Sequence, residues 1–577
     1  MAGGRGYRPS LPRPTLASPA QSPTRNPQFA MAVSPIHRRP NQLGGVRNKS
    51  MPAVDAATRT SPTYRESCNV AELFVLQASA SPDLVAVVEG EHTCTYGELL
   101  SAVEHLADYL VHRGVGPEVI VGCYMERSLA SVVGVLAILR AGGAYLLLDA
   151  QQPPVRLRHM TQDANPLLVL TETNAPEVLD DIECVALQQI LHQPRYPSAR
   201  TSTVGPDVLA YIAFTSGSTG RPKGVLITNS ALRNHAQWFS RQFALKPGDR
   251  IPLMASLVFD VVAEEIFPAL ISGCTLIVSR NLDDVHELGH EITARGYTVL
   301  NLPAPLWHRW VDHLHEHHQP LPRSVRLLVV GSDKILSATF LRWKAVVGAD
   351  NAQWVAAYGT TESTITTACY FTAWQDDLSN EPVIPIGTAV AGAEIYVVDE
   401  AGAPAAPNQV GELCIAGPGL ARGYHRLPEQ TARQFCRLHH DGERGPRVYK
   451  TGDLAVRRAD GVLVWKGRRD NQIKVNGLRI ELNEIEEILL RCPMVGEAVV
   501  VRAHSAGADG TLVAYLVPDH GQLLDASAVA AYLHTRLPVL MTPARLEILP
   551  SLPIGATGKI DRKTLETRAK RQQSQCR

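Results

Sequence analysis

Short apolar runs alternate with helical patterns along the chain from about residue 64 onward. The runs contain three to five residues and are predicted to be buried strands at Leu84–Val88, Val119–Gly122, Leu167–Leu170, Leu276–Val278, Thr298–Leu300 and Leu327–Val330. Between them, segments such as Leu129–Arg140 and Ala263–Leu270 have the apolar spacing of helices. This alternation is typical of α/β proteins with largely parallel sheets. We therefore expect an α/β fold.

The pattern changes twice in the C-terminal third of the chain. After about residue 385 the strands become shorter and Gly or Pro turns separate them, as at Ile395–Val398 and Gly411–Ile415, which predicts a β-rich subdomain. From about residue 471 we expect a compact α+β unit, with helices at Leu482–Arg491 and Ala526–Leu537 and strands at Glu497–Arg502 and Leu512–Val517. The charged turn Gly467–Asn471 marks the boundary. The predicted organisation is a core at 64–469, a C-terminal domain at 470–566 and a tail at 567–577.

Composition narrows the class of protein. A chain of 577 residues is too long for one hydrophobic core, so more than one domain is expected. Fifty-six basic side chains balance 56 acidic ones, so the charge favours neither nucleic acid nor a membrane surface as partner. Ten cysteines without a C-x-x-C pair fit a reducing cytoplasm. The longest apolar region, 120–148, contains Glu126, Arg127 and Arg140 and is not predicted to span a membrane.

Residues 1–62 differ from the rest of the chain. They contain eight arginines and one lysine before Thr60, with Asp55 as the only acid, among many Pro, Ser, Gly and Asn residues. We expect a disordered leader, or a start site placed too early, because Met31 and Met51 offer later starts. A transit peptide is a weaker alternative, since the prolines and glycines would disrupt an amphipathic helix.

One loop has the chemistry of a phosphate site. The strand-like run Tyr211–Phe214 leads into hydroxyl residues and glycines and then to Lys223. Glycines let the backbone approach a polyanion, and hydroxyls, N–H groups and an ammonium hold phosphate oxygens. The loop is not a Walker A motif, because Pro222 stands five residues after Gly217, and alone it also fits a polar connector. Its other candidate ligands are Thr215, Ser216, Ser218, Thr219 and Gly220.

Four more motifs follow, each of which alone also fits a turn or a solvated charge. In Ala357–Glu362, Tyr358 can stack on a purine, Thr361 can bond a phosphate and Glu362 can bind Mg²⁺. In Tyr449–Asp453, the carboxylate after the glycine turn can accept the two hydroxyls of a ribose. The last two motifs are Gly467–Glu481 and Leu552–Arg562, and the latter presents Lys559 beside a glycine.

The five motifs in this order resemble an adenylation domain of the nonribosomal peptide synthetase type, within the adenylate-forming superfamily. The resemblance covers about residues 66–566. Further matching motifs are Thr95–Leu99, Leu139–Tyr145 and Gly411–Tyr424. It implies a large N-terminal part, made of two α/β subdomains and a small β-barrel-like subdomain, and a mobile α+β lid that rotates about the hinge Asp470.

The resemblance also assigns roles to residues. The loop from Thr215 to Lys223 would close on the ATP phosphates, Tyr358 would stack on adenine, and Asp453 and Arg468 would hold the ribose. Thr361 would bind phosphate and Glu362 would bind Mg²⁺. Lys559 would reach the substrate carboxylate and the α-phosphate, where a cation offsets the repulsion between two anions. Lys474 would serve a second lid conformation, in which a thiol attacks the acyl-adenylate.

A separate set of residues matches the pocket for the activated acid. Asp260 matches the residue that pairs with the α-ammonium of amino acids, which favours an amino acid as substrate. Glu264 and Asn301 are polar, so a basic or hydrogen-bonding side chain is one prediction, and a Glu264 that bonds neighbouring backbone is the alternative. The remaining matched positions are Val261, Leu328, Val330, Ala357, Ile365 and Thr366.

The leading hypothesis is an amino-acid adenylating ligase of peptide natural-product assembly. Only 18 residues follow Lys559, so we expect a free-standing enzyme that loads the phosphopantetheine thiol of a separate carrier protein, with an MbtH-like helper as a further candidate partner. The alternatives are an acid–CoA ligase, an amide-forming ligase and a degenerate adenylate-binding regulatory protein. The histidines at 308, 313, 315, 317 and 318 are predicted to lie on a solvated helix face rather than to bind a metal.

Overall fold

The computed structural model describes most of the chain after its leader. The described residues are 69–172, 176–198, 204–217, 221–279, 284–347, 352–372, 378, 381–440, 443–470, 472–475, 478–503, 511–519, 523–554 and 560–575. Of the predicted features, the leader 1–62, the loop residues Ser218, Thr219 and Gly220, and Lys559 lie outside these ranges.

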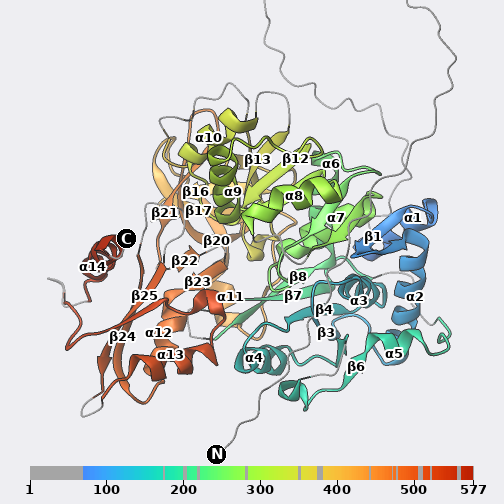
Figure 1. Ribbon diagram of the computed structural model, residues 1–577, viewed down its shortest axis with the longest axis horizontal. Coiled ribbons are helices and arrows are strands. Elements are labelled where there is room, and N and C mark those ends of the chain that lie inside the picture. Colours follow the sequence, from blue (N-terminus) through green and yellow to red (C-terminus); the bar gives the residue numbers. More distant parts are fainter. Residues whose placement is uncertain are drawn as a thin grey trace, which may run out of the picture. The chain divides into compact units, whose positions relative to one another are not determined.

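The largest sheet has seven strands and a parallel centre (Figure 1). Strands β3, β4, β5, β6 and β7 are parallel to their neighbours, whereas β7 and β8 form an antiparallel pair that continues to β18. In spatial order the strands are β18 (Gly423–Tyr424), β8 (Lys223–Thr228), β7 (Leu209–Thr215), β4 (Ala144–Asp149), β3 (Ile120–Met125), β5 (Leu168–Thr171) and β6 (Cys184–Ala186). The apolar runs at 119–122, 167–170 and 211–214 are therefore strands, as predicted.

Two further sheets belong to the same α/β part. One contains β2 (His92–Thr95), β1 (Val85–Glu89), β10 (Thr275–Val278) and β9 (Arg250–Leu253). The other contains β11 (Val299–Pro303), β12 (Leu327–Gly331), β13 (Gln353–Tyr358), β14 (Ala368–Phe371) and β15 (Thr388–Ala389). In both sheets the strands predicted from continuous apolar runs are parallel to a neighbour, and the antiparallel strands (β2 in one sheet, β14 and β15 in the other) follow on one side of the parallel ones. The expectation of α/β architecture is confirmed.

The chain then becomes richer in strands, as the shorter apolar runs predicted. An antiparallel sheet is built from β16 (Glu394–Val398), β17 (Val410–Ala416), β20 (Glu443–Arg457), β19 (Phe435–His440) and β21 (Leu463–Arg468). It is followed by the hairpin β22 (Gln472–Val475) and β23 (Leu478–Glu481) and by the sheet β24 (Val495–Ala503), β25 (Thr511–Pro518) and β26 (Arg545–Ile548). Helices α12 and α13 pack on this last sheet around their own apolar cluster.

Fourteen helices are present within the described ranges. They are α1 (Val70–Ala80), α2 (Tyr96–His112), α3 (Leu129–Arg140), α4 (Pro154–Ala164), α5 (Leu187–Leu191), α6 (Asn229–Gln242), α7 (Val261–Ile271), α8 (Val285–Arg295), α9 (Ala304–Glu316), α10 (Ser337–Val347), α11 (Pro428–Gln434), α12 (Leu482–Leu490), α13 (Ala526–His534) and α14 (Arg562–Gln575). Short 3₁₀ turns are η1 (Glu177–Leu179), η2 (Thr361–Ser363) and η3 (Val539–Met541). None of the described helices is long and apolar enough to cross a bilayer.

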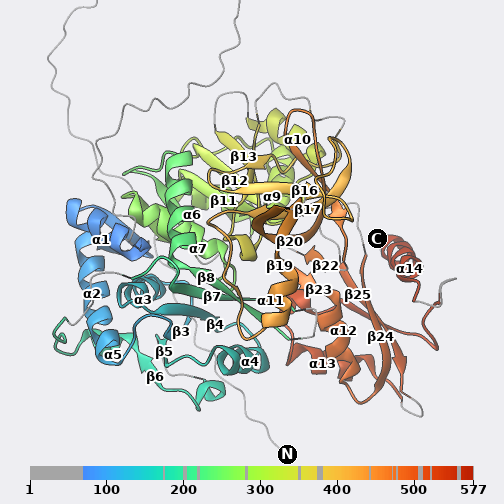
Figure 2. The same cartoon turned by 180° about the vertical axis from the view of Figure 1, so that it is seen from behind.

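Helix α7 lies in the interior and carries two of the residues that matter for the site. Its residues 262–270 are all buried, and α6 packs directly against it (Figure 2). Because the helix is buried on every side, Glu264 and Glu265 are inside the protein and need partners there. Glu265 accepts hydrogen bonds from the backbone N–H groups of Met254 and Ala255.

Two sequence-based expectations need correction. Helix α13 ends at His534 rather than at Leu537, because Pro538 disfavours helical backbone at the residue before it. The histidines of α9 do not all face solvent: His308 and His313 are buried, since α9 packs on its neighbours α8 and α10, and His308 Nε2 accepts a hydrogen bond from the backbone of Leu336. No three His, Cys, Asp or Glu side chains within the described ranges are placed to hold a metal ion.

Candidate active site

A cavity of about 960 Å³ lies where the parallel strands of the α/β part end. The C-terminal residues of β4, β7, β11 and β12 all line it: Asp149, Thr215, Pro303 and Gly331. The carboxyl ends of parallel strands are where open α/β sheets bind their ligands. The cavity is therefore the candidate active site, and the predicted residues can be placed relative to it.

The predicted phosphate loop connects β7 to β8. Thr215 and Lys223 are paired across the antiparallel strands, and both ends of the loop are thereby fixed. A side chain on Gly217 would put a Cβ atom 2.0 Å from the backbone oxygen of Arg221, so only glycine fits there. The hydroxyl oxygen of Thr215 is buried and has no hydrogen-bond partner within the described part of the chain, although it borders the cavity. A phosphate oxygen would satisfy it.

Glu362 is the most deeply buried carboxylate of the site and is surrounded by donors. Its side chain is 0% exposed. Arg479 Nη1 lies 2.8 Å from Oε2, Lys223 Nζ lies 3.5 Å from Oε1, and the hydroxyl of Tyr424 donates to Oε1 at 2.9 Å. Burial alone would raise the pKa of Glu362, but the Arg479 and Lys223 cations outweigh it and lower the pKa to about 2. The carboxylate is therefore ionised at any physiological pH.

Lys223 is almost as buried as its partner. Its ammonium lies 4.3 Å from the centre of the Tyr424 ring and donates to the Tyr424 hydroxyl at 3.2 Å. Burial lowers the pKa of Lys223, and the charge of Glu362 acts in the opposite direction. The loop lysine and the predicted Mg²⁺ ligand thus form one cluster, in which a hard carboxylate oxygen already faces cations. A carboxylate oxygen is a ligand that Mg²⁺ accepts, but Glu362 and Lys223 are not among the residues that line the cavity.

Three side chains converge on Asp453, which lies in β20 and is paired with Arg468, the last residue of β21. The hydroxyl of Tyr358 donates to Oδ2 at 2.6 Å, and Trp465 Nε1 and Arg468 Nη1 donate to Oδ1 at 3.0 and 2.9 Å. Arg468 also bonds Asp470, the predicted hinge, at 2.7 Å. The residues predicted to hold adenine and ribose are therefore joined to one another and to the hinge by direct contacts.

Asp260 lies at the start of α7 and faces the cavity. Its Oδ2 atom is buried and has no hydrogen-bond partner within the described residues. Burial raises the pKa of Asp260 from 3.8 to about 6, and a hydrogen bond from Thr361 only partly opposes this effect. A buried carboxylate oxygen without a partner is costly, so this position is complementary to a cation that enters from the cavity.

Glu264 lies one helical turn further along α7 and also lines the cavity. Asn301 Nδ2 donates to its Oε1 at 2.8 Å, whereas Thr366 Oγ1 and His235 Nε2 donate to Oε2 at 2.8 and 2.7 Å. The partners of Glu264 are thus side chains, two of them predicted pocket residues, and not neighbouring backbone. This network brings Asn301 and Thr366 to the same end of the cavity.

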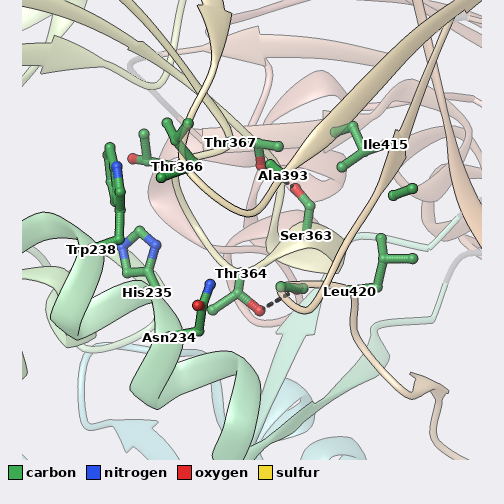
Figure 3. A pocket seen from close by; sticks show the side chains of 14 residues that line it. Asn234, His235, Trp238, Ser363, Thr364, Thr366, Thr367, Ala393, Ile415 and Leu420 are labelled. Carbon is green, nitrogen blue, oxygen red and sulfur yellow. Dashed lines mark hydrogen bonds between the residues drawn. The ribbon is translucent and has the colours of Figure 1, made fainter. Parts of the chain in front are cut away.

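A strained turn next to Glu264 of α7 forms part of the cavity wall, and Figure 3 labels Thr364 and Thr366 in this region. Thr364 and Ile365 both have left-handed backbone, with φ of 60° and 69°. For a β-branched residue such as Ile365 this conformation is unfavourable, by about 1–3 kcal/mol. The turn is held because Gly359 packs against it so closely that an added Cβ would lie 1.7 Å from the Ile365 oxygen. Ile365 and Thr366 are thereby presented to the cavity.

Not every predicted pocket residue lines the cavity. Val261, Ala357, Ile365 and Thr366 do, together with Asp260, Glu264 and Asn301. Leu328 and Val330 do not: both are fully buried in a hydrophobic cluster. The reason is the period of two along β12, because Asn301 is in register with Val329, so that Leu328 and Val330 point to the other face of the sheet.

Lys474 lies in the hairpin β22–β23 and lines the same cavity. Burial lowers its pKa, and the carboxylates of Asp453 and Asp333 oppose the effect. The same hairpin carries Arg479, which also lines the cavity and whose backbone oxygen accepts a hydrogen bond from Ser216 at 2.9 Å. The hairpin therefore brings two basic side chains to the cavity and contacts the predicted phosphate loop.

Sequence reasoning missed three residues that contact the carboxylates of the candidate site. Arg479 and Tyr424 lie inside motifs that resemble those of adenylation domains, so their positions were signalled but their contact with Glu362 was not. His235 lies in α6, outside every motif, and no signal in the sequence pointed to it. All three act on a carboxylate that is remote in the sequence.

Comparisons with known proteins agree with this geometry. The AMP-binding enzyme family matches residues 74–425, and the AMP-binding enzyme C-terminal domain matches residues 484–559. A component of the linear gramicidin synthase of Brevibacillus parabrevis is 36% identical over 88% of this chain and 6% of its own length. Zwittermicin A synthase ZmaJ of Bacillus cereus is 33% identical over 86% of this chain and 94% of its own length.

A solved structure is similar over most of its length. It is holo-PA1221, described as an NRPS protein containing adenylation and PCP domains bound to a vinylsulfonamide inhibitor. The TM-score is 0.77 at 29% identity, covering 87% of this chain and 84% of the other. Among the larger peptide synthases, this chain spans a small share, from 6% of the gramicidin synthase component to 45% of tyrocidine synthase 1 of the same organism.

Proposed function

This chain belongs to the AMP-binding enzyme family, as an adenylation domain of the nonribosomal peptide synthetase type, and we propose that it uses ATP to convert an amino acid to aminoacyl-AMP. The observation that carries the amino-acid part of the proposal is Asp260. Its Oδ2 is buried without a partner among the described residues at the cavity wall, which is where an α-ammonium would supply the missing cation. An acid without an amine would leave that oxygen unsatisfied.

The phosphate side of the cavity supports ATP as the second substrate. The hydroxyl of Thr215 has no partner in the described part of the chain. Lys223, which is paired with Thr215 across β7 and β8, provides an ammonium at the other end of the loop. Glu362, ionised and buried, would hold Mg²⁺ with the phosphate oxygens. The metal would supply positive charge to offset the developing negative charge on the phosphates. Lys223 and Thr215 would then hold the departing pyrophosphate.

The nucleoside side is organised by Asp453. In our proposal its carboxylate accepts the two ribose hydroxyls, while Arg468 and Trp465 fix its orientation. Tyr358 is held by the same carboxylate and places its ring for adenine. Lys559 would bring a cation to the substrate carboxylate and the α-phosphate during attack. It lies outside the described residues, so this role rests on the sequence motif.

The second step would transfer the acyl group to a thiol. We propose the phosphopantetheine of a carrier protein as acceptor, in the assembly of a peptide natural product, because similar proteins include peptide synthases and a protein with adenylation and PCP domains. Lys474, half-buried at the cavity near Asp453 and Asp333, would stabilise the active site in this second lid position, with Asp470 as hinge.

The test is amino-acid-dependent ATP–pyrophosphate exchange by the purified protein, with and without an MbtH-like helper. We expect exchange with at least one amino acid of a panel of proteinogenic and diamino acids. Lys559→Ala should remove most exchange and leave ATP binding measurable by calorimetry. Exchange at the wild-type rate in this variant would exclude the role given to Lys559, and absence of exchange with every amino acid would exclude the function.

A further inference from the structure

The C-terminal lid, from residue 470 onward, meets the rest of the protein through two largely buried ion pairs on the phosphate side of the site. The first joins Arg479 of the hairpin β22–β23 to Glu362. The second joins Arg156 of α4 to Glu484 of α12 at 2.9 Å, with 10% and 1% of the two side chains exposed. Separating a buried ion pair leaves an uncompensated charge inside the protein. Both pairs therefore resist any movement of the lid away from this position.

The first pair occupies the carboxylate that is proposed to hold Mg²⁺. Oε1 of Glu362 faces Tyr424 and Lys223, which belong to the paired strands β18 and β8 of the largest sheet. Oε2 faces Arg479 at 2.8 Å. Mg²⁺ would need one of these oxygens as a ligand, and two cations at one buried carboxylate oxygen repel each other. Arg479 is the cation that can leave, because it alone belongs to the lid.

The second pair lies beside the predicted phosphate loop. Burial raises the pKa of Glu484, and Arg156 and the backbone N–H of Gly217 act in the opposite direction. Gly217 belongs to the loop, and the hydroxyl of its neighbour Ser216 donates to the backbone oxygen of Arg479 at 2.9 Å. The lid thus places acceptor oxygens against a loop whose donors are expected to hold phosphate oxygens. In this position the lid engages groups that the phosphates of ATP would need.

We propose that Arg156 and Glu484 form a latch that holds the lid in the position for thiol transfer, and that this lid position and bound Mg·ATP exclude each other. The same hairpin brings Lys474 to the cavity, which associates the position with the second step. The inference rests on the proposed function and deepens it, since it makes departure of Mg²⁺ and pyrophosphate a condition for the latch to close. Arg156 and Glu484 are positioning residues, because they act through the lid.

Comparing the two partners separates the latch from a direct effect of charge on ATP. Arg156 is a cation and Glu484 an anion near the phosphate loop, so a direct effect would change ATP affinity in opposite directions when each is neutralised. Loss of the latch changes it in the same direction. With either partner removed, a larger fraction of the protein has its lid away from Glu362 and can bind Mg·ATP.

The first experiment is calorimetric titration of the whole protein with Mg·ATP in the absence of an amino acid. We expect Arg156→Gln and Glu484→Gln both to bind Mg·ATP more tightly than the wild type, by about tenfold. A gain of affinity cannot result from misfolding. Arg158→Gln on α4 and Glu487→Gln on α12 are the matched controls and should keep the wild-type affinity. Arg158 is exposed, and Glu487 pairs with Arg491 inside the lid.

The second experiment measures the two half-reactions in the same variants. ATP–pyrophosphate exchange should proceed at least at the wild-type rate, because adenylation uses the other lid position. Transfer from aminoacyl-AMP to the thiol of added pantetheine, followed by mass spectrometry in a single turnover, should fall by about tenfold or more. The control variants should retain both half-reactions. A defect confined to the thiol step is what a lid latch predicts and a general loss of stability does not.

The outcomes separate this inference from the proposed function. Tighter binding in Glu484→Gln with weaker binding in Arg156→Gln would show a direct charge effect and overturn the latch. Unchanged affinity in both variants, or an equal loss of both half-reactions, would also overturn it. If pantetheine accepts no acyl group from the wild type, the binding measurement decides alone. Absence of exchange with every amino acid would overturn the proposed function, whereas titration with Mg·ATP would still test the latch.

Discussion

Replacing Asp260 by Asn should lower the catalytic activity of the enzyme and raise the stability of its fold. Burial raises the pKa of Asp260 from 3.8 to about 6. The difference is about two pH units, and at about 1.4 kcal/mol per unit the ionised carboxylate destabilises the ligand-free fold by about 3 kcal/mol. A raised carboxyl pKa means that this cost is absent below the unfolded value, appears as pH rises towards 6 and is complete above it. Asn has nearly the same shape and no charge.

Thermal unfolding of wild type and Asp260→Asn, measured from pH 4 to pH 8, is the assay for stability. Unfolding entropy of about 2 cal/mol/K per residue gives about 1 kcal/mol/K for a unit of this size, so the gain corresponds to about 3 °C above pH 6 and to none near pH 4. Asp83→Asn, in an exposed turn, is the control and should change little at any pH. A variant without a gain above pH 6 would show that Asp260 has a partner in the free enzyme.

The same substitution should reduce catalysis. Removal of one partner of a buried ion pair costs about 3–5 kcal/mol, so kcat/KM for the amino acid should fall by about 10²–10⁴-fold. The KM for ATP should change much less, since Asp260 is proposed to bind the amino acid whereas Asp453 is proposed to bind the ribose of ATP. Exchange at the wild-type rate in Asp260→Asn would refute the claim that this carboxylate binds the α-ammonium.

Three further predictions concern the contacts that organise the site. Arg479→Ala should destabilise the protein at neutral pH and have little effect near pH 2, because the lowered pKa of Glu362 gives a stability that is present above pH 4.5 and lost towards pH 2. Unfolding by guanidinium at several pH values measures this effect. Arg491→Ala, which removes an exposed pair with Glu487, is the control. Tyr424→Phe removes the hydroxyl between Lys223 and Glu362 and should cost about 1–3 kcal/mol in urea unfolding; an unchanged midpoint would contradict the contact. Gly359→Ala should destabilise the fold severely and reduce ATP–pyrophosphate exchange, because the added Cβ meets the backbone oxygen of Ile365. Gly289→Ala, in open space on α8, should instead stabilise the fold by about 1 kcal/mol. Equal effects of the two substitutions on stability would contradict the packing of the turn.

The sequence predicted most of the fold because its signals are local. Continuous apolar runs become strands buried on both faces, and Leu129–Arg140 is found as a helix with the predicted bounds. The end of one helix was predicted wrongly, because the apolar pattern continues to Leu537 whereas α13 ends at His534, ahead of Pro538. The phosphate loop could also be predicted, since residue types within one short segment define it.

The contacts of the site could not be predicted in the same way. Arg479 reaches Glu362 across 117 positions of sequence, and His235 reaches Glu264 from a different helix. Such pairs depend on how two elements pack, and no periodic pattern encodes them. The faces of β12 show the same limit: resemblance assigned Leu328 and Val330 to the pocket, whereas the register of the strand turns both away from the cavity. The pocket chemistry therefore required the three-dimensional arrangement.

The most direct test of the account compares one amino acid with its des-amino analogue. ATP–pyrophosphate exchange is measured with the best amino acid of the panel and with the carboxylic acid that lacks only the α-amine. The account predicts exchange with the amino acid and a loss of about 10²-fold or more with the analogue, because the analogue leaves the buried Oδ2 of Asp260 without a partner. Equal exchange with both acids would contradict the claim that this site selects amino acids.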